Sequence, residues 1–461
     1  MLRFLLAASS VFEFCGSMKL IKAVQNGDIS KVKKLIDSNV DVNQIDERKK
    51  FAGETALFRA VEGGIFETVQ LLVKSKAEVD HLSAKNETAL MKAASSGNFQ
   101  IVELLVNSRA VVDIVGPNNE TSLMKAVAGG HTQIVELLLA SRAEVNRVNG
   151  KQDSVLSMAA SNGNLEIVRL IVGAGAEVDF LNWGHKTALI SAAKENCADV
   201  VEFLLESKAN IDHCDNFKFT SLIWTAMRGH LSVAEVLVRH KVDLEKRDSN
   251  GETALANAAS RKYLDLVDLL LSNNANPNAL NELAQSPLIH AASNNHVEIV
   301  QTLLKHRADP NIVCPLGRLG TALFRAAFYG HATVVRMLIR ASANVRAVNS
   351  DGETVIMVAF RTNHFDVVKQ LYFAGARIDQ VAIQGLLNSL SVAQEIKDRM
   401  TAKFEEIKRE YVDHLSKLSF SRLARLCDFS HPFPDSTAGF SFENIKLTIA
   451  DMMDHSKKRG I

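Results

Sequence analysis

A repeat of 33 residues constrains the fold of this chain more than any other feature. Aligning the sequence on one leucine gives a ladder in which every step is 33 residues, formed by Leu57, Leu90, Leu123, Leu156, Leu189, Leu222, Leu255 and Leu288. Leu20 precedes this ladder, and Leu323 and Ile356 follow it after one longer and one regular step. These positions define eleven repeats between about residues 18 and 380. So many copies of one motif predict a linear array and exclude a single active site made from the motif itself.

Each repeat predicts two short helices. In the third repeat, Thr88 is placed to cap the first helix, and Ala93 and Ala94 lie on its apolar side. Gly97 can end that helix without steric strain, and the pattern "IVELL" from Ile101 predicts the second helix. A helix pair of this size cannot bury its own apolar face, so neighbouring pairs must stack. The small alanines allow the stacked helices to approach closely.

These repeats closely resemble the ankyrin repeat family. The T-A-L-x-x-A-A pattern matches the family's 33-residue unit and its T-P-L-H-x-A signature, apart from Ala for Pro and loss of the His. Ser286-Pro287-Leu288 restores the proline, and a Gly-His pair recurs at Gly130-His131, Gly229-His230 and Gly330-His331. The resemblance implies an all-α fold, a right-handed solenoid of stacked antiparallel helix pairs with β-hairpin fingers along one edge. It also implies a concave groove, lined by fingers and first helices, that binds proteins and does not catalyse reactions.

The repeats divide the chain into three predicted segments: residues 1–17, the array at residues 18–380, and a C-terminal helical segment at residues 381–461. The first segment "MLRFLLAASSVFEFCGS" has three interpretations: a helix that caps the array, an upstream extension if translation starts at Met18, or a short signal-like stretch interrupted by Glu13. The five cysteines are far apart and form no CxxC, which is typical of a reducing compartment. We therefore expect a cytoplasmic protein, or a secreted one if residues 1–17 act as a signal peptide.

The C-terminal segment is rich in charge and in helix-forming residues. Apolar residues recur there at steps of three and four: Ile396, Met400, Phe404, Ile407, Tyr411, Leu415 and Leu418. This spacing predicts one long amphipathic helix or two in tandem, and residues 441–454 predict a final helix. The segment is expected to cap the last repeat. The alternatives are a module for self-association or effector recruitment, and a cryptic catalytic tail that would use polar residues such as His414, Asp428 and His431.

Composition and motifs argue against several classes of function. Lys and Arg number 53 and Asp and Glu 52, so no global field would attract nucleic acid. No run of about 18 apolar residues predicts a membrane span. The stretch "GAGAEV" at Gly173 lacks the third glycine of a dinucleotide fingerprint, and the histidines and cysteines lack the spacing of a metal site. We expect a protein-binding scaffold or adaptor with no catalytic residues, cofactor or metal.

The side of the first helices that faces the groove changes character in the seventh repeat. Residues two, five and six after the aligned leucine share this side, and in the seventh repeat they are Trp224, Met227 and Arg228. Phe217 and Phe219 precede them in the finger, and Trp183 lies one repeat earlier. Interface centres are enriched in aromatic residues, Met and Arg, so these six residues predict a partner-binding surface. The alternative for Trp224 is a core position between neighbouring first helices. A weaker second surface is predicted in the tenth repeat, at Phe324, Arg325, Phe328 and Tyr329.

A row of basic residues, Arg59, Lys92 and Lys125, occupies the same groove position in earlier repeats. Acidic residues recur with the same period on the adjoining fingers, at Glu54, Glu87, Glu120 and Asp153. We expect the two rows to neutralise each other, and the alternative is an acidic partner.

Two insertions lengthen the fingers, at Gln44–Ala52 and Ile312–Gly320. Each predicts either a partner contact or a harmless loop extension. The family resemblance also makes a set of asparagines at the end of "VN" or "PN" conceivable targets of asparagine hydroxylation: Asn43, Asn146, Asn278 and Asn311.

Overall fold

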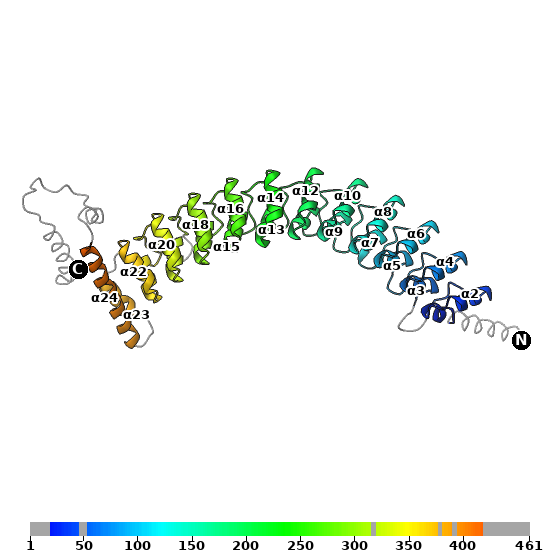
Figure 1. The fold of residues 1–461 in the computed structure, drawn as a ribbon, viewed down its shortest axis with the longest axis horizontal. Helices are drawn as coiled ribbons and strands as arrows, with labels where there is room; N and C mark the ends of the chain where they lie inside the picture. Colours follow the sequence, from blue (N-terminus) through cyan, green and yellow to red (C-terminus); the bar gives the residue numbers. More distant parts are fainter. Residues whose placement is uncertain (1–18, 46–52, 315–319, 377–379, 390–393, 418–461) are drawn as a thin grey trace, which may run out of the picture. The chain divides into compact units, whose positions relative to one another are not determined.

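The computed structural model describes residues 19–45, 53–314, 320–376, 380–389 and 394–417 of the 461-residue chain (Figure 1). The chain forms two compact units, Met1–Ala275 and Asn276–Ile461. In both units the described helices come in antiparallel pairs, one pair for each repeat. The structure is therefore the all-helical array of stacked pairs that the 33-residue period predicts.

In the first compact unit the helices form two rows (Figure 1). The first helices of the repeats are α3 (Ala56–Glu62), α5 (Ala89–Ser96), α7 (Ser122–Ala128), α9 (Val155–Asn162), α11 (Ala188–Lys194), α13 (Ser221–Arg228) and α15 (Ala254–Ser260). The second helices are α2 (Ile29–Asp37), α4 (Phe66–Lys74), α6 (Phe99–Asn107), α8 (Thr132–Ala140), α10 (Leu165–Gly173), α12 (Ala198–Glu206), α14 (Leu231–Arg239) and α16 (Leu264–Ser272). Residues 19–25 are also helical, and a short 3-10 turn, η1, spans Pro117–Asn119. First helices pack on first helices and second on second, so each repeat contacts mainly its neighbours.

The predicted helix boundaries are confirmed in the third repeat. The Thr88 hydroxyl accepts a hydrogen bond of 3.2 Å from the Met91 amide, which satisfies one of the free donors at the start of α5. Gly97 ends the helix with φ of 74°, a left-handed conformation that glycine adopts without strain. Threonine or serine caps the other first helices of this unit in the same way, at Thr55, Thr121, Ser154, Thr187, Thr220 and Thr253.

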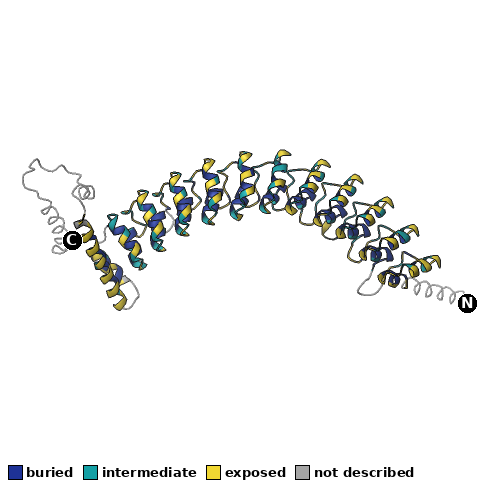
Figure 2. Ribbon diagram, in the orientation of Figure 1, coloured by how far each residue is buried: buried dark blue, intermediate teal, exposed yellow. Residues whose placement is uncertain are grey.

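The core is a continuous seam between the pairs. The aligned leucines of the first unit, from Leu57 to Leu255, are at most 1% exposed, and Ala93 and Ala94 are fully buried. Each buried leucine contributes roughly 1.5 to 3 kcal/mol by removing apolar surface from water. In Figure 2 the buried sides of the helices face their neighbours and the exposed sides face outward. The alanines keep neighbouring first helices close, and this places the residues around them at the groove.

Side-chain hydrogen bonds shape the fingers. In several repeats an Asn or Asp oxygen accepts from the amides two and four residues later, as at Asn149, Asn182, Asp215 and Asp248. Because the side chain satisfies these amides, the expected hairpins are short. Single antiparallel bridges close two of them, Val148 with Ser154 and Cys214 with Thr220.

A second set of side-chain bonds ties each finger to the next. Asp80 Oδ1 accepts from the Val111 amide at 2.9 Å, and Asp113 Oδ1 accepts from the Glu144 amide at 3.0 Å. The same bond, which we call the finger tether, recurs at Asn146, Asp179 and Asp212. The fingers of this unit are therefore fixed to one another as well as to their helices.

The second compact unit repeats this arrangement and ends in two further helices. Its first helices are α17 (Pro287–Ser293), α19 (Ala322–Phe328) and α21 (Val355–Arg361), and its second helices are α18 (Val297–Lys305), α20 (Ala332–Arg340) and α22 (Phe365–Phe373). They are followed by α23 (Gln380–Ser389) and α24 (Gln394–Ser416), and the predicted apolar stripe from Ile396 to Tyr411 lies on α24. Helix α23 contacts α21, and α24 contacts α22.

Helix α24 packs on the last repeat through aromatic rings. The Phe404 ring lies 5.7 Å from the rings of Phe360 and Tyr372, and the Tyr411 ring lies 5.0 Å from that of Tyr372. Met400, Phe404, Ile407 and Tyr411 of the predicted stripe are buried, whereas Ile396 is exposed. Leu418 and the predicted final helix at residues 441–454 lie outside the described residues.

Candidate functional site

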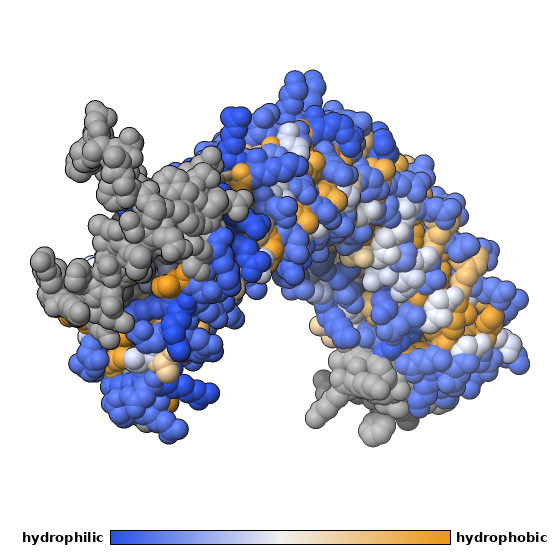
Figure 3. Space-filling view, turned by 60° about the vertical axis from the view of Figure 1, so that its left-hand side comes forward, coloured by the Kyte–Doolittle hydropathy of each residue, from blue (hydrophilic) through white to orange (hydrophobic). Residues whose placement is uncertain are grey.

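Apolar groups interrupt the hydrophilic surface on the face drawn in Figure 3. In the first compact unit, two of the largest exposed apolar side chains are on neighbouring fingers: Trp183 is 68% exposed and Phe217 is 62% exposed. The Phe217 ring lies 6.0 Å from that of Phe219, which in turn meets the Trp224 ring edge-on at 5.2 Å. We call these four residues the aromatic surface. The structure thus brings the rings of Phe217, Phe219 and Trp224 together, and it places Trp183 on the neighbouring finger, whose backbone accepts a hydrogen bond from Asn216.

One buried carboxylate, that of Asp215, holds this surface in place. Its Oδ1 accepts from the amides of Phe217 at 2.9 Å and Phe219 at 3.0 Å, and its Oδ2 accepts from Trp224 Nε1 at 3.0 Å. Asp215 is only 4% exposed. Trp224 itself is partly buried, with its indole nitrogen bonded at the base of the finger. It is therefore neither a fully buried core residue nor a fully exposed one, and its orientation is fixed.

Cationic side chains surround the Trp224 ring. Lys186 Nζ lies 5.0 Å from the ring centroid, Lys194 Nζ 5.7 Å and the Arg228 guanidinium 6.0 Å. These distances are within the range in which a cation is attracted to the face of an aromatic ring. Arg228 is exposed and Met227 is partly buried, so both remain at the edge of the aromatic surface. Sequence reasoning missed Lys186, Lys194 and Asp215, although the first two come from the repeat before Trp224.

The finger position three residues before the aligned leucine gives the signal that would have found Lys186. This position is acidic from the second to the fifth repeat, and it becomes Lys186 in the sixth and Phe219 in the seventh. The earlier repeats are neutralised as predicted, since Arg59 pairs with Glu54 and Lys125 Nζ lies 2.6 Å from Glu120. Lys92 departs from the expected partner and pairs with Glu62 at 3.2 Å. Asp153 instead accepts from Asn182 Nδ2 at 2.8 Å.

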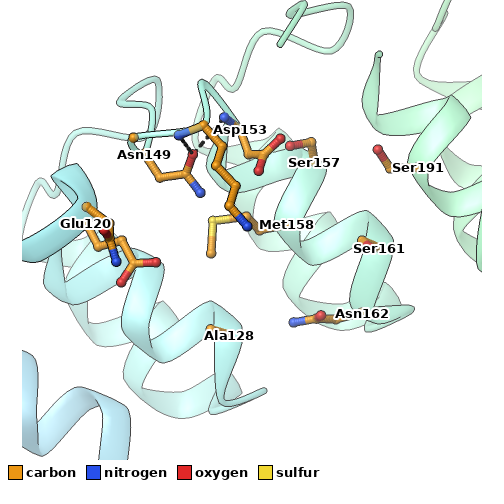
Figure 4. A pocket seen from close by; sticks show the side chains of 12 residues that line it. Glu120, Ala128, Asn149, Asp153, Ser157, Met158, Ser161, Asn162 and Ser191 are labelled. Atoms are coloured by element: carbon orange, nitrogen blue, oxygen red, sulfur yellow. Dashed lines mark hydrogen bonds between the residues drawn. The ribbon is translucent and has the colours of Figure 1, made fainter. Parts of the chain in front are cut away.

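A polar hollow of about 500 Å³ lies beside this surface, between α7, α9 and α11 (Figure 4). It is lined by Asn118, Glu120, Ala128, Asn149, Gly150, Lys151, Asp153, Ser157, Met158, Ser161, Asn162 and Ser191. The hollow forms because the groove-facing residues are small at three successive points, Ala128, Ser161 and Ser191. Sequence reasoning missed it, and the signal was this run of small residues between Lys125 and Trp224. Ser191 and Lys194 share α11, so the hollow adjoins the cations around Trp224.

The second predicted surface, in the other compact unit, needs one correction. Phe324 is 1% exposed, so its assignment to an exposed surface is wrong. It follows the aligned leucine directly, and residues at this position, such as Met91 and Met124, face the neighbouring first helix in the core. Tyr329 is exposed and its ring lies 5.0 Å from that of Phe328, whereas Phe328 and Arg325 are partly buried. Only Tyr329 gives this second surface a large exposed apolar group.

The asparagines considered for hydroxylation hold fingers together. Asn146 Oδ1 accepts from the Glu177 amide at 3.0 Å, and Asn278 and Asn311 make the same kind of bond in the second compact unit. Asn43 Oδ1 accepts from the Glu78 amide at 2.8 Å. Their hydroxylation stays a prediction. Residues 1–17 and the centres of both insertions, residues 46–52 and 315–319, lie outside the described residues.

The described residues contain no cluster of three or more His, Cys, Asp or Glu side chains arranged to hold a metal ion. No helix in the part of the chain that the structure describes has the length and hydropathy needed to cross a bilayer.

Comparison with known proteins identifies the repeat. A family model described as ankyrin repeats, in three copies, matches residues 20–116, 76–149, 123–215, 208–281 and 288–382. The chain belongs to the ankyrin repeat family. The resemblance inferred from the T-A-L-x-x-A-A pattern is therefore confirmed, and ankyrin repeats are generally protein-binding modules.

Two similar proteins carry the same kind of array. An ankyrin repeat and KH domain-containing protein of Caenorhabditis briggsae is 42% identical over 65 residues, which is 14% of this chain and 2% of that protein. The matched part of this chain therefore spans only a small fraction of that relative's length. The crystal structure of the human ASB11 ankyrin repeat domain is 25% identical, covers 49% of this ankyrin chain and all of its own, and has a TM-score of 0.45.

Proposed function

We propose that this chain is a non-catalytic scaffold or adaptor that binds a partner protein at the aromatic surface. The observation that carries the proposal is the exposure of Trp183 and Phe217 on adjacent, hydrogen-bonded fingers. Aromatic side chains bury much apolar area at low conformational entropy, and they are the residues on which interface energy concentrates. A partner that covers both rings gains roughly 1.5 to 3 kcal/mol from each.

Rigid presentation supplies the rest of the mechanism. Asp215 fixes the finger and the Trp224 indole together, and Asn216 Nδ2 donates to the Trp183 carbonyl at 3.0 Å. The Trp224 indole and the backbones of the two fingers are thus held in place before a partner arrives. Less conformational entropy is lost on binding than for a loop that must fold around its partner.

Two further features of the chain enter the proposal. We place the protein in the cytoplasm, because Cys197 and Cys214 are free thiols. We assign α24 the role of a cap, because its aromatic residues cover Phe360 and Tyr372 of the last repeat. The rival interpretation, a catalytic tail, needs His414, whose ring stacks on Phe373 at 5.5 Å, together with Asp428 and His431 outside the described residues.

The proposal is tested by comparing partners of the full chain with those of a Trp183→Ala, Phe217→Ala double variant. Both side chains are mostly exposed, so the variant is expected to keep the melting temperature of the native chain. Quantitative cross-linking mass spectrometry should show at least one partner reduced about tenfold, as loss of a central aromatic pair predicts.

The matched control is Val111→Ala with Val313→Ala, which removes two exposed apolar side chains from other fingers. It should retain every partner. If the control and the aromatic variant give the same partner list, the aromatic surface is not the binding site.

A further inference from the structure

We infer that the aromatic surface binds an extended segment of a partner protein that carries acidic side chains next to apolar ones. This inference rests on the proposed function and adds the charge of the partner. Three observations support this inference. The periodic charge of the fingers is interrupted, two cations around Trp224 have no carboxylate partner among the described residues, and there is space for a peptide chain beside them.

The break in charge occurs at Lys186. Four preceding fingers have a carboxylate at this position, Glu54, Glu87, Glu120 and Asp153, and the sixth has an ammonium group. In the second and fourth repeats the carboxylate neutralises a groove cation of its own repeat. In the sixth repeat the cation is itself on the finger, and the residue two after the aligned leucine is the neutral Ser191. The charge of this finger position is thus reversed, from negative in the four preceding repeats to positive in the sixth.

Two of the three cations around Trp224, Lys186 and Arg228, have no carboxylate partner among the described residues. The third, Lys194, pairs with Glu195 at 3.1 Å. Asp215 carries the carboxylate nearest in sequence to Trp224. This carboxylate is buried, and its two oxygens accept hydrogen bonds from the finger amides and from the indole. The positive charge of this surface is therefore available to a partner.

The shape of the groove favours an extended segment. Ser161 and Ser191 line the polar hollow (Figure 4), and Lys194, on the same helix as Ser191, lies 5.7 Å from the Trp224 ring. A chain lying over α11 would contact Lys194 and the aromatic rings at one end and have room for its side chains at the other. Apolar side chains of the partner would cover Phe217 and Trp183, and its carboxylates would meet the unpaired cations.

The limits of the positive patch distinguish an acidic peptide from a nucleic acid. Asp153, Glu120 and Lys151 line the hollow beside it, and Glu120 is already paired with Lys125. A regular polyanion that continued along the groove would therefore meet mixed charge in place of a continuous positive surface. A short cluster of acidic residues followed by neutral or basic ones fits this pattern. Single-stranded nucleic acid, which also stacks on aromatic rings, is the rival occupant.

The test uses a displayed library of random dodecapeptides selected against the full chain. The enriched peptides are expected to combine acidic and apolar residues, and their binding is measured by fluorescence anisotropy. Lys186→Glu should weaken binding of the best peptide about tenfold, because it replaces an attraction with a repulsion at the centre of the patch. The variant should fold normally, since five other repeats carry glutamate at this position: Glu54, Glu87, Glu120, Glu252 and Glu353.

The matched control is Lys33→Glu, which makes the same change of charge on the exposed surface of α2. It should leave the affinity unchanged. The inference is overturned if enriched peptides are neutral or basic, if Lys186→Glu binds as the native chain does, or if a dodecamer of thymidylate displaces the peptides at lower concentration than free peptide does. In these cases the proposed function still stands if the Trp183→Ala, Phe217→Ala variant loses the peptides. Peptides that bind this variant normally refute both.

Discussion

At the scale of the residue, Asp215 links its finger to the first helix of its own repeat, as Asp248 does through the Asn257 side chain. Asn149 and Asn182 also accept two finger amides, but only Asp215 meets a tryptophan indole with its second oxygen. An asparagine there would present an amide nitrogen to one of these donors. The carboxylate is thus required by Trp224 and not by the turn.

Asp215→Asn is therefore expected to destabilise the seventh repeat by about 1 to 3 kcal/mol, because either orientation of the amide leaves a buried donor unpaired. Urea denaturation followed by tryptophan fluorescence measures the effect. In a Trp224→Phe background, which lacks the indole N–H, the same substitution should have little further effect. An equal loss in both backgrounds would mean that the Asp215–Trp224 hydrogen bond does not stabilise the fold.

Individual residues also show where sequence reasoning succeeds and fails. The cap at Thr88 and the end at Gly97 were predictable because they depend only on local backbone geometry. The exposed Phe217 was predictable because turn residues are seldom buried. Phe324 was misassigned because one step around a short helix separates the groove from the core. Lys186 was missed because its contact with Trp224 joins two repeats and depends on the side-chain conformation.

At the scale of the element, ion pairs link neighbouring second helices. Glu202 of α12 accepts from His240 Nε2 and from Arg239 Nη1, both at 2.8 Å, at the end of α14. The hydrogen bond from His240, with a smaller contribution from Arg239, holds the pKa of Glu202 below its ordinary value. A carboxylate with a lowered pKa stabilises the fold above its unfolded pKa, and this contribution is lost as the pH falls through the folded value.

Glu202→Gln should accordingly reduce the free energy of unfolding at neutral pH by less than about 1 kcal/mol, as for other partly exposed ion pairs. The difference from the native chain should shrink as the pH falls below the ordinary pKa of glutamate. Thermal melts at a series of pH values measure it. The control is Glu136→Gln, an exposed carboxylate of α8. A deficit that persists at acid pH would contradict the ion-pair explanation.

The elements themselves were more predictable than their contacts. The two helices of every repeat follow from apolar spacing, and α24 was visible as a stripe that included Phe404 and Tyr411. The hollow between α7, α9 and α11 was not predicted, because it results from small groove-facing side chains in three neighbouring repeats. The number of helices in the C-terminal stretch was also left open, since the spacing of the stripe fits one helix or two.

At the scale of the whole molecule, an array is a chain of local stabilities, because each repeat contacts mainly its neighbours. The last repeat has α24 on the side where another repeat would otherwise lie. Removing the aromatic contacts of α24 should therefore loosen the end of the array and leave distant repeats unaffected.

Phe404→Ala tests this expectation, since it deletes a fully buried ring in contact with Phe360 and Tyr372. A loss of about 3 to 5 kcal/mol is expected locally. Amide hydrogen exchange should accelerate in α21 and α22 and stay unchanged in α3 to α6. Val412→Ala, at an exposed position of the same helix, serves as the control. Faster exchange throughout the chain would indicate a single cooperative unit instead.

The finger tethers also determine how a chain of this kind can change its length. Each repeat offers one side-chain oxygen to the next finger and receives one from the finger before, as Asp80, Asp113 and Asn146 do in succession. A block of 33 residues therefore contains one acceptor oxygen and one donor amide of this kind. When such a block is duplicated or deleted, the fingers that become neighbours can still form the hydrogen bond. The Lys186–Trp224 contact lacks this property, because it belongs to one junction. A block inserted at that junction would leave an intact array in which Lys186 no longer contacts the Trp224 ring of the proposed binding surface.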